Sequence, residues 1–398
     1  MKKILLIIFA ATIALSCGGG NKPNVTAIDN NGGDTNGGDN SGGGDTSGGG
    51  DTSGGGDTSG GLTGGSDTSC NDQSTAINGW LLPVDEVKDG GPGKDGIPSI
   101  DNPVFTDVSG VDPTILKDDD LVMGIVKNGE VKAYPYPIMN WHEIVNDKFN
   151  GEPVAINYCP LTGTAFAWNG ESNGSPTSFG VSGLLYNNNL ILYDRSTDTN
   201  WSQLKLQAVN GAVLGEKPTL SNVVETDWKT WKTLYPDTKV LTTTTGFDRP
   251  YNIYPYGDYR TNQDLFLFAV NPLNNDLPHK ERVYAIIACT TSKVYRFQNF
   301  TDGKVLKETF EGVNYLVVGN ENLINSFVLN DSQKDLTFTF SFTDSEVFFT
   351  DDEGNNWNAF GTALSGPRTG EILEGARSVV SYWFAIAAFY PNPVISTD

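Results

Sequence analysis

The sequence predicts a mainly β protein with a few helices, an α+β body, on the basis of its β-forming runs and its sparse helical segments. Short runs rich in Val, Ile, Leu, Tyr and Phe are broken by Asn, Gly, Asp and Pro at intervals of about 8 to 15 residues, which is typical of strands and turns. The predicted strands are Leu121–Val126, Val131–Tyr134, Val154–Asn157, Ser178–Val181, Leu190–Tyr193, Val283–Ala288, Tyr315–Val318, Leu336–Phe342 and Val347–Thr350.

Three segments have helical spacing instead. They are Pro137–Val145, Glu225–Tyr235 and Arg377–Phe389. Aromatic stripes in the last two indicate packing in a core rather than contact with a cofactor.

The body is predicted to consist of two diverged β-rich repeats packed as one, residues 79–245 and 246–398. Apolar and aromatic runs of the first part recur in order in the second at an offset of about 154 to 161 residues. In this register Asn320 stands where the first repeat has Cys159, and no histidine stands where His142 would map. The polar residues found only in the first repeat are therefore the candidates for a site.

The N-terminus predicts export and lipidation. Residues 1–16 read as a signal peptide, with Lys2 and Lys3 before the apolar run Ile4–Leu15. Cys17 after small residues resembles a bacterial lipobox, so we expect a lipid anchor on its thiol; an ordinary cleaved signal is the alternative. Gly18, rather than Asp, favours the outer membrane of the cell envelope, on its periplasmic or surface face.

Residues 17–69 predict a flexible, lipid-anchored tether. They are mainly Gly, Asp, Ser, Thr and Asn, with too little apolar surface to offset the entropy of ordering. A calcium-binding β-roll would need an apolar residue in each repeat unit, and these units have none. The membrane, through Cys17, is the expected partner, while the net charge of −22 argues against nucleic acid.

Three cysteines remain after Cys17, so one disulfide within the chain leaves one thiol free. A Cys70–Cys289 pair would leave Cys159 available. The alternative is that Cys70 and Cys289 are unpaired.

Cys159 and His142 are the leading candidates for chemistry. The run Asn157-Tyr158-Cys159-Pro160 predicts a strand that ends in a turn, with the thiol at the strand's end. A reactive thiolate needs a nearby cation or hydrogen-bond donors, for which His142 and Arg195 are candidates, with His142 as base or orienting partner. The alternatives are a Cys159 that serves as a small buried apolar residue and a His142 with a structural role.

Several longer motifs resemble a bacterial family named only as Domain of Unknown Function 3179. The resemblance covers about residues 90–398 and rests on Asp95–Pro103, Trp141–Asp147, Tyr158–Thr164, Phe179–Tyr186 and Trp201–Gln203. The family implies no settled activity, substrate or cofactor. Many members have a second redox residue where this chain has Thr162, in a Cys-Pro-Leu-Cys run, and that residue would imply thiol redox chemistry or soft-metal binding.

Three hypotheses follow for function. The first is a thiol-centred site in the first repeat, for redox or thiol-transfer chemistry, in which Cys159 reacts, His142 assists and Arg195 binds an anion. The second is a copper-like metal site made by Cys159, His142 and Met139, ligands that suit a soft metal. The third is a non-catalytic binding or structural lipoprotein.

Overall fold

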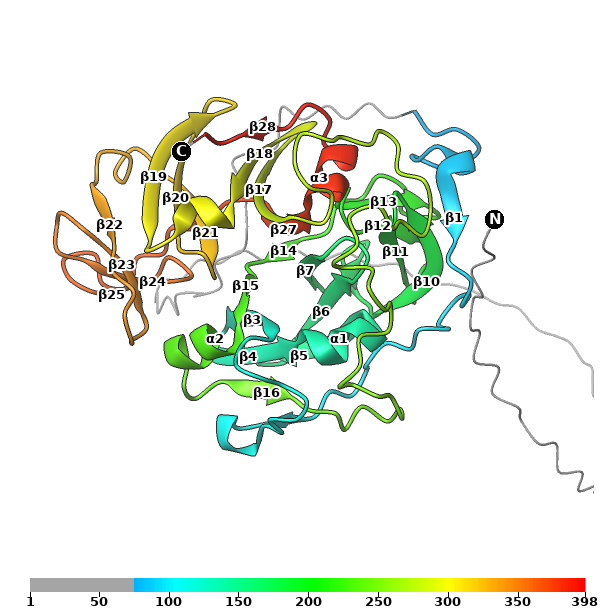
Figure 1. The fold of residues 1–398 in the computed structure, drawn as a ribbon, viewed down its shortest axis with the longest axis horizontal. Helices are drawn as coiled ribbons and strands as arrows, with labels where there is room; N and C mark the ends of the chain where they lie inside the picture. Colours follow the sequence, from blue (N-terminus) through cyan, green and yellow to red (C-terminus); the bar gives the residue numbers. More distant parts are fainter. Residues whose placement is uncertain (1–74, 398) are drawn as a thin grey trace, which may run out of the picture. The chain divides into compact units, whose positions relative to one another are not determined.

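The computed structural model describes residues 75–397, and the predicted mainly β class is confirmed in this part of the chain. It contains three α-helices among strands that form seven sheets (Figure 1). The predicted signal peptide, Cys17 and the tether lie outside the described residues. Across residues 75–397 no helix is both long and apolar enough to cross a bilayer.

Three sheets are formed by residues before 242. The first has the order β15-β3-β4-β16-β2 (Val224–Asp227, Leu121–Lys127, Glu130–Pro135, Lys239–Leu241, Phe105–Thr106). The second has the order β14-β7-β6-β5 (Leu220–Ser221, Thr164–Asn169, Glu152–Cys159, Ile144–Phe149). The third has the order β1-β10-β11-β12-β13 (Val87–Asp89, Phe179–Tyr186, Asn189–Asp194, Asn200–Ser202, Gln207–Asn210), and β8 and β9 (Glu171–Ser172, Ser175–Pro176) form a small ribbon.

Three further sheets are formed by residues after 281. The first has the order β27-β17-β18-β28 (Ser378–Tyr382, Arg282–Ala288, Thr291–Arg296, Val394–Ile395). The second has the order β19-β20-β21-β26 (Lys304–Phe310, Val313–Gly319, Ile324–Val328, Glu374–Gly375). The third has the order β22-β23-β24-β25 (Phe338–Phe340, Val347–Asp351, Asn356–Asn358, Ala363–Ser365).

The two sets of sheets correspond in strand order and direction. The pairs β15–β3 and β27–β17 are antiparallel, whereas the pairs β4–β16 and β18–β28 are parallel. Polar clusters between neighbouring sheets correspond as well, because in each set a Lys and a Tyr two residues apart bind one carboxylate. The clusters are Lys132, Tyr134 and Asp147 in the first set and Lys293, Tyr295 and Glu308 in the second.

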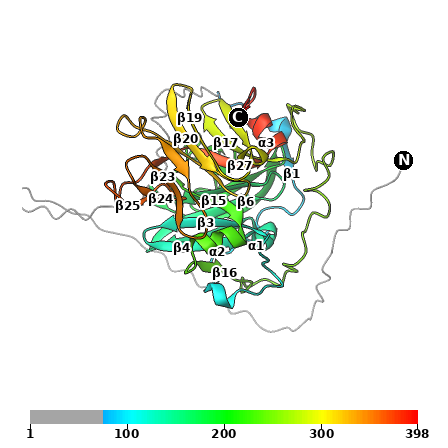
Figure 2. The ribbon, with the colours of Figure 1, turned by 60° about the vertical axis from the view of Figure 1, so that its left-hand side comes forward.

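The two short helices that follow β15 and β27 each pack on the other set of sheets. In α2 (Trp228–Leu234), Trp231 packs edge-on against Phe360 with the ring centroids 6.2 Å apart. In α3 (Trp383–Phe389), Phe389 packs against Tyr186 of β10 at 5.3 Å. Figures 1 and 2 both show α3 beside the sheet that contains β1. This exchange of helices buries the two halves against each other.

All three predicted helices exist, but their predicted boundaries were wrong. α1 spans Tyr136–His142, and Ile144 and Val145 begin strand β5. The residues before α2 and α3 are likewise strands, since Glu225 lies in β15 and Ser378–Tyr382 form β27. Pairing with β3 and β17 satisfies the backbone hydrogen-bonding groups of these residues. The apolar residues of these strands continue the spacing of the following helix only by coincidence.

Gly124 of β3 lies directly against the indole ring of Trp231. A Cβ atom at this position would lie 2.0 Å from Trp231 Cζ3, and Trp231 is fully buried. We expect Gly124→Ala to lower the free energy of unfolding by about 2 kcal/mol, because an overpacked ring must leave its rotamer. Urea titration followed by tryptophan fluorescence measures this loss.

A double variant provides the control. Adding Trp231→Leu to Gly124→Ala removes the clash, so the double variant should lose less stability than the sum of the two single variants. Strict additivity would contradict the proposed contact.

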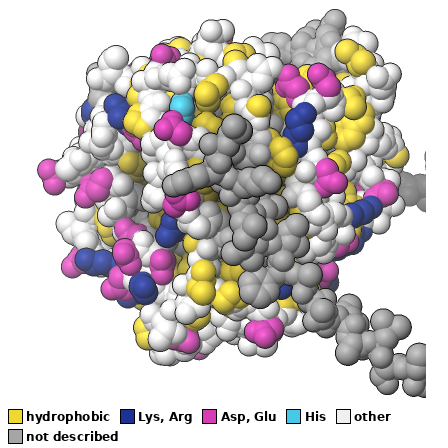
Figure 3. All heavy atoms as spheres, turned by 45° about the vertical axis from the view of Figure 1, so that its right-hand side comes forward, with side chains coloured by type: hydrophobic (Ala, Val, Ile, Leu, Met, Phe, Trp, Pro, Cys, Tyr) yellow, Lys and Arg dark blue, Asp and Glu magenta, His cyan; other side chains and the backbone are white. Residues whose placement is uncertain are grey.

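Residues 242–281, here called the connecting segment, join β16 to β17 without forming a helix or a strand. Loops of this length in compact proteins are uncommon and usually have a functional role. The segment carries four of the large apolar side chains that are exposed to solvent: Phe247, Ile253, Leu267 and Leu273. On the face shown in Figure 3, apolar side chains reach the surface between acidic and basic ones.

Candidate functional site

Cys159 is the last residue of β6, as the sequence predicted, and a tight turn follows it. The amides of Thr162 and Gly163 donate to the Cys159 carbonyl at 3.3 and 2.8 Å. Gly163 has φ = 62°, and a Cβ there would lie 3.2 Å from the ring of Tyr382. The turn therefore needs glycine both for its backbone conformation and for space.

The Cys159 thiol is free and buried. Its side chain is 1% exposed, and Sγ donates a hydrogen bond to the carbonyl of Asn188 at 3.5 Å. Burial and, after it, the negative charge of Glu143 raise the pKa of Cys159 to about 11. Near neutral pH the group is therefore a protonated thiol.

Cys289 is disulfide-bonded. The predicted partner, Cys70, lies outside the described residues. Within residues 75–397, Cys159 is the cysteine that remains free.

His142 is fully buried at the end of α1, and both of its ring nitrogens are engaged. Nδ1 lies 2.8 Å from the carbonyl of Pro98, and Nε2 lies 2.7 Å from the hydroxyl of Tyr251. A carbonyl only accepts, so Nδ1 carries a proton. Burial lowers the pKa of His142, and neutral Nε2 accepts from Tyr251. Cys159 is not among the hydrogen-bond partners of His142 that the described structure contains.

Arg195 is also engaged away from Cys159. Its guanidinium donates to Asp101 at 3.1 Å and to Asp95 at 3.5 Å, and it also donates to the hydroxyls of Ser99 and Ser178. Two carboxylates thus neutralise the cation that the sequence offered as an anion-binding group.

Met139 is fully buried in an apolar cluster with Tyr134, Ile138 and Val145. In the described part of the chain no three His, Cys, Asp or Glu side chains converge as ligands for a metal ion. Of the residues of the predicted copper-like site, Cys159 and Met139 pack in different apolar clusters.

Glu143 is the charged residue that the tertiary structure brings to Cys159. It follows α1 with φ = 58°, donates its amide to Met139, and accepts the amide of Tyr158 at 2.7 Å. This unusual backbone turns the chain directly from helix α1 into strand β5. The side chain is 5% exposed, and burial raises the pKa of Glu143 to about 7, opposed by a hydrogen bond from Tyr256. A carboxyl group with this pKa can take up and release a proton near neutral pH.

Tyrosines of the connecting segment surround the thiol and the carboxyl group. Tyr256 donates to Glu143 Oε1 at 3.3 Å, and Tyr254 donates to the carbonyl of Pro160 at 3.5 Å. Burial raises the pKa of both tyrosines, and negative charge on Cys159 would raise it further. Sequence reasoning missed these residues because no periodic pattern marks the segment.

Two asparagines in the turn between β10 and β11 hold the connecting segment over Cys159. Asn188 donates to the carbonyl of Phe268 and accepts its amide, at 2.9 and 3.0 Å. Asn187 pairs in the same way with Asn271, at 2.9 and 2.8 Å. The carbonyl of Asn188 also accepts from the thiol. The turn between β10 and β11 therefore binds both the connecting segment and the Cys159 thiol.

A fully hydrogen-bonded polar network lies beneath the turn that follows Cys159. Thr162 and Thr164 share a hydroxyl hydrogen bond of 2.8 Å, and Asn189 donates to both hydroxyls. Gln203 accepts from Thr164 at 2.6 Å and donates to Asn157 at 3.0 Å. All five side chains are buried, so this network fixes the position of Thr162 next to Cys159.

A match to one protein family covers most of the chain. Residues 94–393 match the family described as "Protein of unknown function (DUF3179)". The chain belongs to the DUF3179 family. No curated protein and no solved structure matches it.

In this DUF3179 protein the family motifs converge in space. Asp95 and Asp101 bind Arg195, the charge of Glu143 raises the pKa of Cys159, and Gln203 anchors the network beneath Thr162. The resemblance stated from the sequence is thereby confirmed over most of its range.

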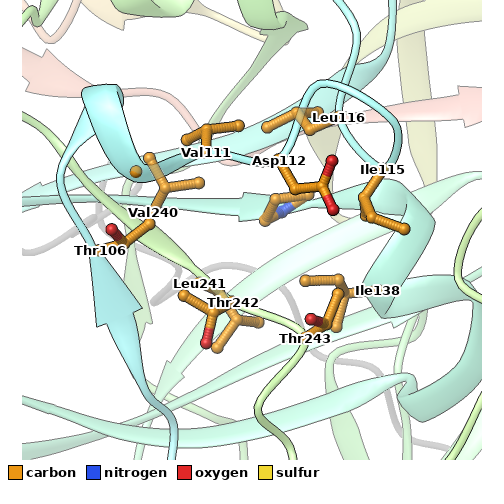
Figure 4. A pocket seen from close by; sticks show the side chains of 12 residues that line it. Thr106, Val111, Asp112, Ile115, Leu116, Ile138, Val240, Leu241, Thr242 and Thr243 are labelled. Atoms are coloured by element: carbon orange, nitrogen blue, oxygen red, sulfur yellow. The ribbon is translucent and has the colours of Figure 1, made fainter.

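A separate small cavity of about 90 Å³ lies between α1, β16 and the loop at 110–116 (Figure 4). Apolar side chains such as Ile115, Ile138 and Val240 line it together with Asp112. The carboxylate of Asp112 already accepts from the amide and hydroxyl of Thr114 at 2.8 and 2.7 Å. None of the predicted site residues lines this cavity.

Proposed function

We propose that this DUF3179 protein carries a thiol-centred site for redox or thiol-transfer chemistry, in which Cys159 reacts and Glu143 takes up its proton. The observation that carries the proposal is the free thiol beside a buried carboxyl group whose pKa is about 7. Glu143 thus takes the role of base that the sequence suggested for His142. Arg195, bound to two aspartates, supports the turn at residues 95–101.

The chemistry is a thiol–disulfide exchange with a small disulfide substrate. Glu143 accepts the proton of the Cys159 thiol, and the thiolate attacks one sulfur of the substrate. A bond forms between Cys159 Sγ and that sulfur, while the substrate S–S bond breaks. The leaving thiolate takes the proton from Glu143, so electrons and protons balance without another reactant.

Burial of the site makes access through the connecting segment part of this proposal. The thiol is 1% exposed, and the side chains of Asn187 and Asn188 hold residues 268 and 271 in place. A substrate reaches Cys159 when these hydrogen bonds open.

Replacing Glu143 by Gln tests whether Glu143 accepts the proton of Cys159 or only places a negative charge near the thiol. Because the charge of Glu143 raises the pKa of Cys159, removing the charge alone would make the thiol more acidic and the reaction faster. If Glu143 accepts the proton, we expect Glu143→Gln to react roughly tenfold more slowly at about pH 8. Mass spectrometry of the mixed disulfide formed at Cys159 with hydroxyethyl disulfide measures the rate.

The pH profile and two variants complete the experiment. In the unchanged protein the rate should rise as Glu143 ionises at about pH 7, and this rise should vanish in Glu143→Gln. Cys159→Ser should form no adduct at position 159, and Glu321→Gln, an exposed carboxylate, should leave the rate unchanged. A faster Glu143→Gln variant, or a Cys159 that never reacts in native protein, would overturn the proposal.

We also propose that the two sets of sheets arose by duplication and divergence, with the repeats at 79–245 and 246–398. The corresponding strand orders and the paired Lys-Tyr-carboxylate clusters support this. So do two buried aspartates that accept from a tryptophan indole, since Asp194 binds Trp201 and Asp351 binds Trp357. In the second set Asn320 accepts amide hydrogen bonds from Asn322 and Leu323 at the end of β20. The thiol site would then belong to the first repeat alone.

For location, the proposal is a lipoprotein of the bacterial cell envelope, anchored through Cys17 in the outer membrane and held off it by residues 18–69. The sequence of residues 1–17 supports this. Metabolic labelling with a fatty acid in the unchanged protein, and its loss in Cys17→Ala, tests the anchor.

A non-catalytic binding or structural lipoprotein is the second candidate. The observation in its favour is the burial of both Cys159 and His142 with hydrogen-bond partners in place. It predicts that Cys159→Ser leaves stability nearly unchanged and that no thiol reaction occurs before unfolding.

A further inference from the structure

Lys280 is a buried lysine whose amine has no hydrogen-bond partner among residues 75–397. It lies at the end of the connecting segment, immediately before β17, and its residue is 4% exposed. Nζ is among the buried polar atoms that find no acceptor in the described structure. Lysine is rarely buried without a partner, so this position needs a physical explanation.

Aromatic rings take the place of acceptors around the amine. Nζ lies 3.3 Å from the ring centroid of Tyr259 and 4.7 Å from those of Phe266 and Phe384, with Tyr382 at 5.8 Å. We call these four rings the Lys280 cage. They come from the connecting segment and from the region of α3, and Phe266 packs edge-on against Phe384 at 5.0 Å.

The backbone on both sides of Lys280 is fixed. Its amide donates to Gln263 Oε1 at 2.7 Å. The carbonyl of His279 accepts the amide of Phe384 at 3.1 Å. These hydrogen bonds fix the backbone at Lys280, and none of them involves Nζ.

The ionisable groups next to Lys280 are engaged elsewhere. Glu281 binds the guanidinium of Arg296 at 2.6 and 2.8 Å, and the ring of His279 binds Gln263 and Asn275. Burial lowers the pKa of Lys280 to about 7. A substantial part of the amine is then unprotonated near neutral pH, which is the nucleophilic form.

We propose that Lys280 is a nucleophilic amine site that forms a Schiff base with small apolar or aromatic aldehydes and ketones. The nitrogen lone pair attacks the carbonyl carbon, a C–N bond forms, and the carbonyl oxygen becomes a hydroxyl group by taking up a proton. Loss of this oxygen as water leaves the C=N bond, so the amine and carbonyl give the imine and water with no other reactant. The ring faces stabilise the protonated imine, as they do other cations.

Reductive methylation with formaldehyde and cyanoborohydride tests the site in the full-length protein. At about pH 7 an ordinary exposed lysine is almost wholly protonated, so we expect Lys280 to be methylated at least about ten times faster than exposed lysines. Peptide mass spectrometry gives the rates for Lys280 and, in the same sample, for Lys148 and Lys229, which are exposed. The advantage of Lys280 should disappear by about pH 10, where exposed amines also become free.

An aromatic carbonyl tests the ligand class. Benzaldehyde with borohydride should leave a stable benzyl adduct on Lys280 of the unchanged protein and on Cys159→Ser, but not on Lys280→Met. The Cys159→Ser arm keeps this inference separate from the thiol proposal. Methylation of Lys280 no faster than that of Lys148, or only after addition of urea, would overturn the inference, and so would equal benzyl labelling of Lys280→Met.

Discussion

Replacing Asp194 by Ala is expected to lower the free energy of unfolding by about 4 kcal/mol, the range for breaking a buried charged network. Asp194 ends β11, is fully buried, and accepts four hydrogen bonds. The donors are the Ser196 hydroxyl, the amide and hydroxyl of Thr197, and the indole of Trp201, at 2.9, 2.7, 2.7 and 3.0 Å. Without the carboxylate, the buried indole N–H loses its acceptor.

The contribution of the Asp194 carboxylate to the free energy of unfolding should depend on pH. Burial alone would raise the pKa of Asp194, but hydrogen bonds from Trp201 and Thr197 lower it below its usual value. Because the folded-state pKa is the lower one, the carboxylate stabilises the protein above the unfolded-state pKa of about 3.9. This stabilisation is lost as the pH falls through the folded-state pKa, so the difference between Asp194→Ala and the unchanged protein should shrink in acid.

Two variants serve as controls in urea titrations. Asp331→Ala removes a carboxylate that is 97% exposed and should leave the free energy of unfolding nearly unchanged. Asp351→Ala should resemble Asp194→Ala, because Asp351 accepts from the Trp357 indole and from Asn355. A cost below about 1 kcal/mol for both buried aspartates would contradict the importance of these networks.

Replacing Lys280 by Met is expected to stabilise the protein by about 3 kcal/mol at pH 7 and to leave it nearly unchanged near pH 10. In the folded state the pKa of Lys280 is lowered to about 7, whereas an unfolded lysine has a pKa of about 10.4. Between these values the unfolded chain binds more protons, so the stability of the unchanged protein rises with pH across this window. Met has a similar length, no charge to desolvate, and favourable contacts with aromatic rings.

The measurement is the difference in unfolding free energy between the two proteins at several pH values. Lys280→Arg is the matched control, because its guanidinium cannot lose its proton and should be destabilising at every pH. Parallel stability curves for Lys280→Met and the unchanged protein would show that the amine is already partnered when charged. This outcome would also weaken the case for a nucleophilic Lys280.

The sequence identified most of the elements because strands and helices here follow local patterns. The predicted strands around Val122, Ala133, Ile156 and Ile286 are all present, and Cys159 does end its strand. Helix boundaries were less predictable. Glu225, for example, belongs to a strand because it pairs with Met123 of β3, a residue about a hundred positions earlier in the chain. The spacing of apolar residues along the sequence contains no information about such pairing.

By itself, the sequence determined the mainly β class, the DUF3179 motifs and the place of Cys159 at the end of a strand. Only the tertiary structure decided what surrounds that thiol. His142 binds Pro98 and Tyr251, whereas the charge of the next residue, Glu143, raises the pKa of the thiol. The physical reason is that burial and long-range contacts set the charge states of Cys159, Glu143 and Lys280. Some of these neighbours, such as Tyr256 for Glu143 and Phe384 for Lys280, come from segments about a hundred residues away in the chain, which a local pattern does not encode.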